Sequence, residues 1–199
     1  MNKEKEEQKF KPYNGNNILI TPDDILSILN KCEVTDLKIN DLNSKDAYNE
    51  FFKTCACKEF SRQMVEQIPF TDKAELLKKT RAIFEGLSKD HWLESFEGHP
   101  KIGDVNSLKE KFQNTKMTAA SEQSGVDTAS DVILSDLALY NEKYLNKFGH
   151  IFIVCATGKS AADMLKVLRQ RIENSLEEEI YIASMEQLEI TLLRMEKLI

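Results

Sequence analysis

The chain has 199 residues and a formal net charge of −6, and 41% of its residues are hydrophobic and 30% charged. This length suits one domain with a sizeable core, and the composition is ordinary for a globular protein. With only 7 glycines and 4 prolines an all-β or disordered chain is disfavoured, and the negative charge disfavours nucleic acid or an anionic membrane as the main partner.

No targeting or membrane segment is expected. No apolar run approaches the ~20 residues of a transmembrane helix, Met1–Lys11 lacks the apolar core of a secretory signal, and the C-terminus is not a peroxisomal tripeptide. We therefore predict a cytoplasmic protein. The cysteines form no CxxC pair, so we expect mostly buried free thiols at Cys32, Cys55, Cys57 and Cys155.

The first 37 residues are predicted to be an N-terminal extension with one helix, ahead of a helical domain over residues 38–199. Thr21-Pro22-Asp23-Asp24 combines a cap, a proline at the first helical position and two acids at the positive end of the helix dipole. Apolar residues at helical spacing predict the next four helices, over residues 44–55, 58–68, 72–87 and 89–98. Asp72 with Glu75 resembles a capping box.

A sharp break follows at Gly98-His99-Pro100, within the stretch Glu97–Asp104. Gly98 suits the left-handed position after a helix, and Pro100 favours an extended His99. A histidine fixed in this way suits proton transfer near neutral pH, although a solvated turn histidine would give the same pattern.

A short polar helix over residues 107–112 and a small-residue stretch over residues 118–125 come next. Glu122 and Gln123 in that stretch either face a cavity or belong to an ordinary helix end closed by Gly125. A long helix is then predicted from Ala129 to Phe148, ending at Gly149.

Residues 150–156 form the one run typical of a buried extended segment. Thr157-Gly158-Lys159-Ser160 resembles the end of a P-loop, but the first glycine of that motif would fall on Ile153, so nucleotide binding is disfavoured. Ser160 with Asp163 is instead read as a capping box that opens a helix through Ile172.

The last helix is predicted over residues 176–198 and carries Arg194 among apolar neighbours. This arginine either extends its charged end to solvent or binds a buried anion. Together these elements predict an all-α fold, a single domain of about eight or nine helices with one buried extended segment.

In this order, the motifs resemble the OHCU decarboxylases, which act on 2-oxo-4-hydroxy-4-carboxy-5-ureidoimidazoline in urate breakdown. The resemblance covers residues 39–199 and rests on a set of short motifs: Trp92 to Phe96, His99 to Asp104, Glu122 to Gly125, Lys147 to Gly149, Phe152 to Ser160, and Leu193-Arg194. It implies a cofactor-independent lyase that produces (S)-allantoin, uses no metal, binds a small-molecule substrate and is often a homodimer.

The resemblance also implies roles for individual residues. The catalytic pair falls on His99 and Glu122, which would act in proton transfer. The substrate contacts fall on Pro100, Ala119, Ala120, Ser121, Gln123, Ile151, Phe152, Ile153, Val154, Cys155 and Arg194. Ala119 stands where a serine is expected, which puts one hydroxyl contact in doubt.

Two alternatives belong to other classes. The chain could be a non-catalytic helical module that binds a protein or a small ligand, in which case His99, Glu122 and Arg194 would not converge. A metal site built from His99, His150 and a cysteine is disfavoured because the ligand spacing is absent.

Overall fold

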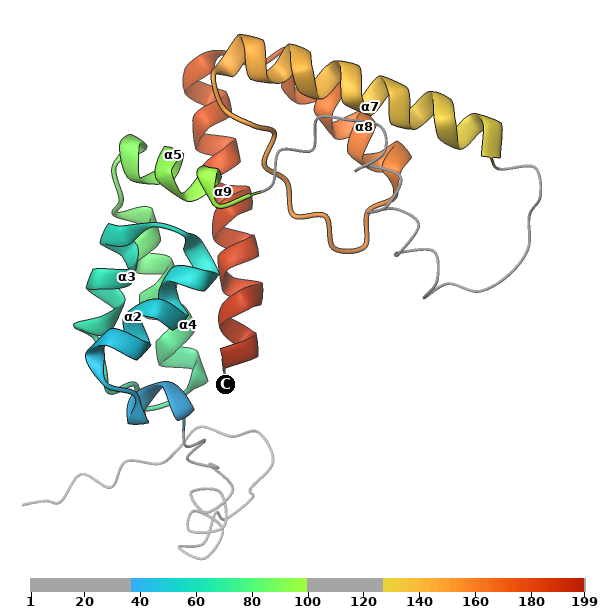
Figure 1. Cartoon of the computed structure of the whole chain (residues 1–199). Helices are drawn as coiled ribbons and strands as arrows, with labels where there is room; N and C mark the ends of the chain where they lie inside the picture. Colours follow the sequence, from blue (N-terminus) through green and yellow to red (C-terminus); the bar gives the residue numbers. More distant parts are fainter. Residues whose placement is uncertain (1–36, 100–126, 199) are drawn as a thin grey trace, which may run out of the picture. The chain divides into compact units, whose positions relative to one another are not determined.

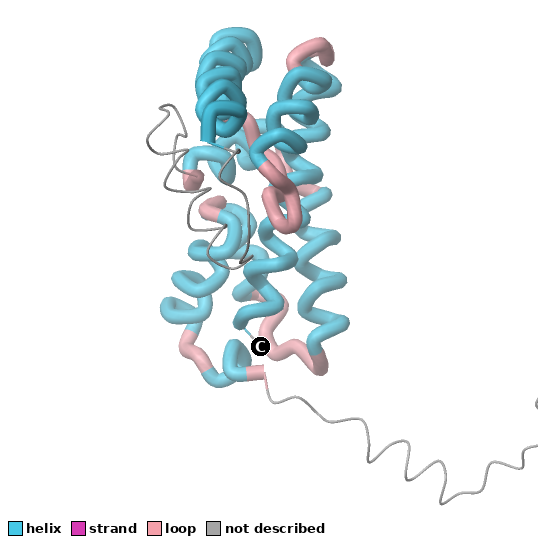
Figure 2. Tube along the Cα trace, turned by 90° about the vertical axis from the view of Figure 1, so that its right-hand side faces the viewer, coloured by secondary structure: helices cyan, strands magenta, loops and turns pink. Residues whose placement is uncertain are grey.

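The described part of the protein, a computed structural model, comprises residues 37–99 and 127–198, with side chains from residue 131 in the second range. Within these ranges it contains seven α-helices, two 3₁₀ helices and no strand (Figures 1 and 2). This confirms the all-α prediction. The predicted cap at Thr21, the helix over residues 107–112 and the stretch over residues 118–125 lie outside the described residues. The elements are η1 (Lys38–Asp41), α2 (Ser44–Cys55), α3 (Lys58–Val65), α4 (Lys73–Glu85), α5 (Lys89–Glu97), α7 (Asp127–Phe148), α8 (Ala161–Arg171), α9 (Leu176–Met195) and η2 (Glu196–Leu198).

Side-chain caps explain where several helices begin. The Asn43 side chain accepts hydrogen bonds from the first turn of α2, and Ser160 and Ser175 open α8 and α9 with complete capping boxes. At α4 the predicted box is only half formed. Asp72 accepts from the backbone N–H of Glu75, but the Glu75 carboxylate accepts from Thr71, one residue earlier than a capping box requires.

Helix α9 joins the two groups of helices. It contacts α2, α4, α5 and α7, and Figure 1 shows the group of α2, α3 and α4 toward its C-terminal half and the pair of α7 and α8 toward its N-terminal half. Leu188 and Met195 of α9 enter the core of the first group, and Ile180 and Ala183 pack with Phe96 and Ile153. No helix in the described ranges is long and apolar enough to cross a bilayer.

Several helix ends differ from the sequence prediction; α4, for example, stops at Glu85 instead of Leu87, and α9 stops at Met195 instead of Leu198. Helix α3 stops at Val65 instead of Ile68, because the backbone tightens there: the N–H of Gln67 donates to Met64 and that of Ile68 to Val65. The left-handed conformation expected at Gly98 is also wrong, since Gly98 has φ −70° and ψ −3°.

Gly98 is required for close packing. A Cβ at Gly98 would fall far inside van der Waals contact of the Cβ of Ala56. It is Ala56, in the turn between α2 and α3, that has a positive φ of 58°. The end of α5 therefore lies directly against this turn, where no side chain fits between the backbones.

Residues 150–156 are non-helical, as predicted, but only His150 and Ile153 are buried while the others are half-buried. Gly149, with φ 75°, precedes this segment at the end of α7. Cys55, Cys57 and Cys155 are free thiols, the first two buried; Cys32 lies outside the described residues.

We expect Gly98→Ala to lower the free energy of unfolding by about 1–3 kcal/mol, because the new methyl group must displace the turn at Ala56. Gly86→Ala is the matched control: a Cβ at this position would meet only two carbonyl oxygens at 3.5 Å, so stability should stay equal or rise by up to about 1 kcal/mol. Urea titration of both variants checks this, and equal midpoints would contradict it.

Candidate active site

His99 is fixed at the end of α5 by contacts at its backbone and its ring. Its N–H donates to the carbonyl oxygen of Phe96 at 3.1 Å, and Gly98 before it is packed on Ala56. The ring Nε2 lies 2.6 Å from Oε1 of Gln187 on α9. The imidazole is half-buried, so the ring is held in place and can still meet a ligand.

Gln187 belongs to a polar row along α9. Its side chain is fully buried, as is that of Thr191 one turn later. Gln187 Nε2 donates to Thr191 Oγ1 at 3.4 Å, and the Thr191 hydroxyl donates to the Gln187 carbonyl at 2.9 Å. The polar groups in this row thus satisfy one another and His99.

Arg194 lies on the same face of α9, seven residues or about 10 Å along the axis from Gln187. Its Nη1 donates to the carbonyl oxygen of Thr54 at 3.0 Å, which is one of the orphan acceptors at the C-terminal end of α2. His99 and Arg194 therefore border the same α2–α3 turn, through Ala56 and Thr54 respectively. Burial raises the pKa of the intervening Cys55 thiol well above its ordinary range, which keeps it protonated.

The segment Ile151–Cys155 is held by side chains. Arg171 Nη1 donates to the carbonyl oxygen of Ile153 at 2.7 Å, and its guanidinium lies 4.7 Å from the ring centroid of Phe152. The backbone N–H of Cys155 donates to Glu186 Oε2 at 2.7 Å. Because Glu186 is the neighbour of Gln187, the same turn of α9 anchors both His99 and this segment.

A buried ion pair supports that arrangement. Arg171 and Glu179 lie 2.5 Å apart with side chains 7% and 0% exposed. Glu179 also accepts from the hydroxyl of Tyr144 and from the amide of Asn174 at 2.7 Å. Burial and the bond to Glu179 raise the pKa of Tyr144 well beyond its usual range, so the phenol remains a donor.

His150 lies in an aromatic environment rather than beside an acid. Its ring centroid is 5.2 Å from that of Phe96 and 5.5 Å from that of Tyr144. Its Nδ1 is 3.0 Å from the carbonyl oxygen of Ile151. Burial lowers the pKa of His150, which favours a neutral ring with a structural role.

The remaining predicted site residues lie outside the described part of the chain: Pro100, Ala119, Ala120, Ser121, Glu122 and Gln123. Of the predicted site residues, the structure describes His99 and Ile151–Cys155, which are held by neighbouring residues of α9, and Arg194, which lies two turns further along that helix. Among the residues that the structure does describe, no group of three or more His, Cys, Asp or Glu side chains could hold a metal ion.

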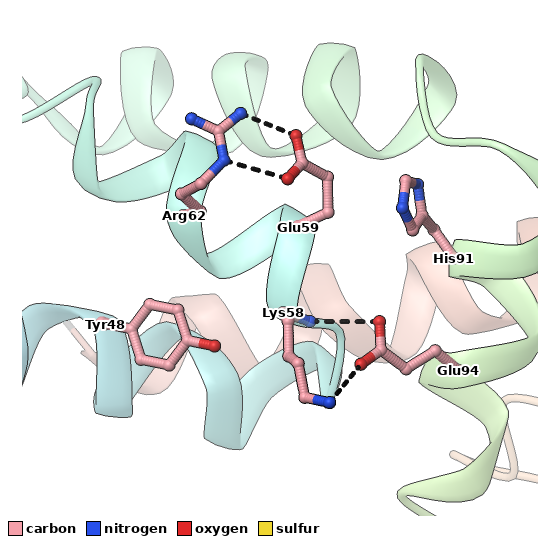
Figure 3. A pocket seen from close by; sticks show the side chains of 6 residues that line it. All are labelled: Tyr48, Lys58, Glu59, Arg62, His91 and Glu94. Atoms are coloured by element: carbon pink, nitrogen blue, oxygen red, sulfur yellow. Dashed lines mark hydrogen bonds and ion pairs between the residues drawn. The ribbon is translucent and has the colours of Figure 1, made fainter.

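An open cavity of about 400 Å³ lies elsewhere, among α2, α3 and α5 (Figure 3). Figure 3 shows Arg62 bonded to Glu59 and Lys58 bonded to Glu94, so the charges at its edge pair with one another. It is lined by Tyr48, Lys58, Glu59, Arg62, His91 and Glu94. None of these is a predicted site residue.

Sequence reasoning missed the side chains that orient the site. Glu179, Gln187 and Thr191 interrupt the apolar, core-facing stripe of α9, and a polar residue at such a position signals a buried hydrogen bond. That signal was present in the sequence. It did not identify the partners, since His99 is 88 residues from Gln187.

Residues 40–196 match the OHCU decarboxylase family. This chain belongs to the OHCU decarboxylase family. A uric acid degradation bifunctional protein of Arabidopsis thaliana is 36% identical over 150 residues, which are 75% of this chain and 46% of the relative. The chain thus spans less than half the length of that curated relative. A 2-oxo-4-hydroxy-4-carboxy-5-ureidoimidazoline decarboxylase of Halalkalicoccus jeotgali is 25% identical over 130 residues, 65% of this chain and 71% of the relative.

Solved structures agree with the family assignment. A crystal structure of OHCU decarboxylase in the presence of (S)-allantoin is 36% identical, has a TM-score of 0.60, and aligns with 75% of this chain and 96% of that chain. An (S)-allantoin synthase at 18% identity and TM-score 0.57 covers 81% of this chain and 53% of its own. The latter shows the shared fold alone.

We expect Arg171→Met to lower the free energy of unfolding of this family member by about 3–5 kcal/mol, because the buried Glu179 carboxylate would keep its bonds from Tyr144 and Asn174 but lose its positively charged partner. The control is Arg169→Met, which breaks the exposed pair between Arg169 and Asp136 and should cost less than about 1 kcal/mol. Thermal and urea unfolding of the two variants compare the effects, and a similar loss in both would contradict a dominant role for the buried pair.

Proposed function

We propose that this chain decarboxylates 2-oxo-4-hydroxy-4-carboxy-5-ureidoimidazoline to (S)-allantoin in urate degradation, without a cofactor. The family match over residues 40–196 supports the substrate class. The observation that carries the proposal is the placement of His99, held by the buried Gln187 next to the turn of α9 that anchors Ile151–Cys155.

The substrate makes a cofactor unnecessary. Its leaving carboxylate is on a carbon that bears a hydroxyl group and adjoins an unsaturated ring carbon. When the carbon–carbon bond to the carboxylate breaks, the electron pair flows into the ring as carbon dioxide leaves. The protein must then orient the carboxylate, polarise the hydroxyl and return a proton to one face of the ring.

His99 and Glu122 are proposed to move these protons, a contribution that is typically worth ~10²–10⁴-fold in rate. Arg194 is proposed to bind substrate oxygens with the rest of its guanidinium fork, while one nitrogen stays on Thr54. The backbone of Ile151–Cys155 would form one wall of the substrate site. Further contacts are proposed, on the family resemblance, for Pro100, Ala119, Ala120, Ser121 and Gln123.

The same resemblance underlies the rest of the proposal. We propose a homodimer in the cytoplasm, with residues 1–37 as an extension outside the enzyme domain over residues 38–199. The match to the family, which begins at residue 40, supports this boundary.

His99→Asn should lower turnover of freshly generated substrate by at least ~10²-fold, because a positioned acid–base group is lost, and should lower the free energy of unfolding by only about 1–3 kcal/mol, because the buried Gln187 side chain loses its partner. His91→Asn is the matched control, since His91 begins α5 on the surface and contacts Ser88; its turnover should equal that of the parent. Substrate loss and allantoin handedness are followed optically. Turnover near the parental rate in His99→Asn would refute the mechanism.

Arg194→Lys keeps the positive charge but removes the planar fork, so substrate affinity should fall roughly tenfold while the protein stays folded. KM and the melting temperature of the variant measure the two effects. If the melting temperature collapses or the kinetics do not change, the bond to Thr54 is the whole role of Arg194.

A further inference from the structure

The backbone of Cys155 is bonded at both ends to ionisable side chains. Its N–H donates to Oε2 of Glu186 at 2.7 Å, and its carbonyl oxygen accepts from Nζ of Lys159, also at 2.7 Å. Cys155 lies outside the helices, so helical hydrogen bonds do not supply these partners. A hydrogen bond with one ionised partner is roughly twice as strong as a neutral one. We call these two bonds the Cys155 clamp.

The two bonds of the Cys155 clamp come from different parts of the fold. Glu186 is on α9, 31 residues along the chain from Cys155. Lys159 lies in the turn before α8, where its own N–H donates to the carbonyl oxygen of Ala156 at 3.1 Å and Gly158 has φ 74°. Both side chains are half-buried. The lysine of this stretch, which resembles the end of a P-loop, is therefore directed to the protein's own backbone.

The Cys155 clamp holds the C-terminal end of the segment Ile151–Cys155. In the described part of the chain, one other side chain from a distant element bonds this backbone: Arg171 donates to the carbonyl oxygen of Ile153. Backbone outside helices and strands depends on such partners. Beyond Ile153, the position of the segment thus depends on Glu186 and Lys159.

We propose that Glu186 and Lys159 are positioning residues for the proposed reaction, which together place the C-terminal half of Ile151–Cys155 as a wall of the substrate site. This inference rests on the proposed function. Each side chain acts through the backbone of Cys155, and neither transfers a proton. Glu186 is required as a hydrogen-bond acceptor and Lys159 as a donor, so a side chain that keeps the same bond can replace either one.

The first experiment measures hydrogen exchange at the Cys155 amide of the full-length protein by NMR with ¹⁵N-cysteine labelling, and Cys155→Ala assigns the signal. Because a bonded amide exchanges slowly, Glu186→Met should speed exchange at least about tenfold. Glu186→Gln keeps an oxygen acceptor and should speed it less than about threefold. Lys159→Met should also speed exchange, although Lys159 does not bond this N–H, because it holds the same residue. Fast exchange at Cys155 in the parent overturns the inference.

The second experiment separates positioning from loss of folded protein. Partial unfolding lowers the apparent kcat and leaves KM unchanged, whereas displacement of a wall of the substrate site raises KM. Glu186→Met and Lys159→Met should each raise KM at least about threefold and lower kcat/KM at least about tenfold. Glu186→Gln and Lys159→Arg keep the hydrogen bond, so their kcat/KM should stay within about threefold of the parental value.

Matched controls and a double variant sharpen the comparison. Glu189→Met on α9 and Lys166→Met on α8 make the same substitutions at exposed positions and should alter neither measurement. The double variant Glu186→Met/Lys159→Met tests whether both side chains act on one residue. Its loss of kcat/KM should stay within about threefold of the larger single loss, because a residue released at one end has less to lose at the other. Losses that multiply would overturn the shared role.

The outcomes separate the two proposals. A parent without decarboxylase activity refutes the proposed function, while slow exchange at Cys155 that depends on both side chains still supports the Cys155 clamp. In an active parent, parental KM and kcat in Glu186→Met and Lys159→Met overturn the positioning role. A Glu186→Gln variant as impaired as Glu186→Met, with parental exchange at Cys155, also overturns it in favour of direct proton transfer by the carboxylate. If Glu186→Met fails to fold, Lys159→Met decides the outcome from the other end of Cys155.

Discussion

Buried polar side chains on α9 need hydrogen-bond partners. The bonds that they form with residues of other segments hold the candidate site together. Glu179 and Gln187 are fully buried, where an unsatisfied polar group would cost about 1–3 kcal/mol or more. Their partners come from other segments: Arg171 from the end of α8 and His99 from the end of α5. Arg171 in turn donates to the carbonyl oxygen of Ile153 in the non-helical segment, and His99 lies just after the end of α5, so both bonds help to fix backbone outside the helices.

The segment Ile151–Cys155 shows the consequence most clearly. Backbone outside helices and strands needs other partners, and here Arg171 binds the carbonyl of Ile153 while Glu186 binds the N–H of Cys155. A buried ion pair contributes little net stability compared with apolar packing. At Arg171 the ion pair holds the guanidinium in one position. The guanidinium in turn holds the segment that the proposed reaction would use.

The α2–α3 turn has a comparable role on the other side of the site. Gly98 packs on Ala56, and Arg194 donates to Thr54. The positions of the candidate residues His99 and Arg194 are therefore both set by contacts with the end of α2 and the turn that follows it. The structure shows for Arg194 a contact that neither alternative from the sequence named, a bond to the carbonyl oxygen of Thr54. It satisfies a helix terminus with one nitrogen, and its planar fork is oriented by that bond.

The sequence by itself determined the all-α class, the start of α2 at Ser44, the capping of α8 by Ser160 and the break after Phe148, because caps and glycines act through neighbours within four residues. Only the tertiary structure decided that Gly98 is needed for close packing, and not for a left-handed backbone, and that Gln187 binds His99. Gly98 packs against Ala56, which is 42 positions earlier in the sequence. Gln187 is hydrogen-bonded to the ring of His99, which is 88 residues away. Such contacts exist only after packing has brought the segments together, so no local pattern encodes them.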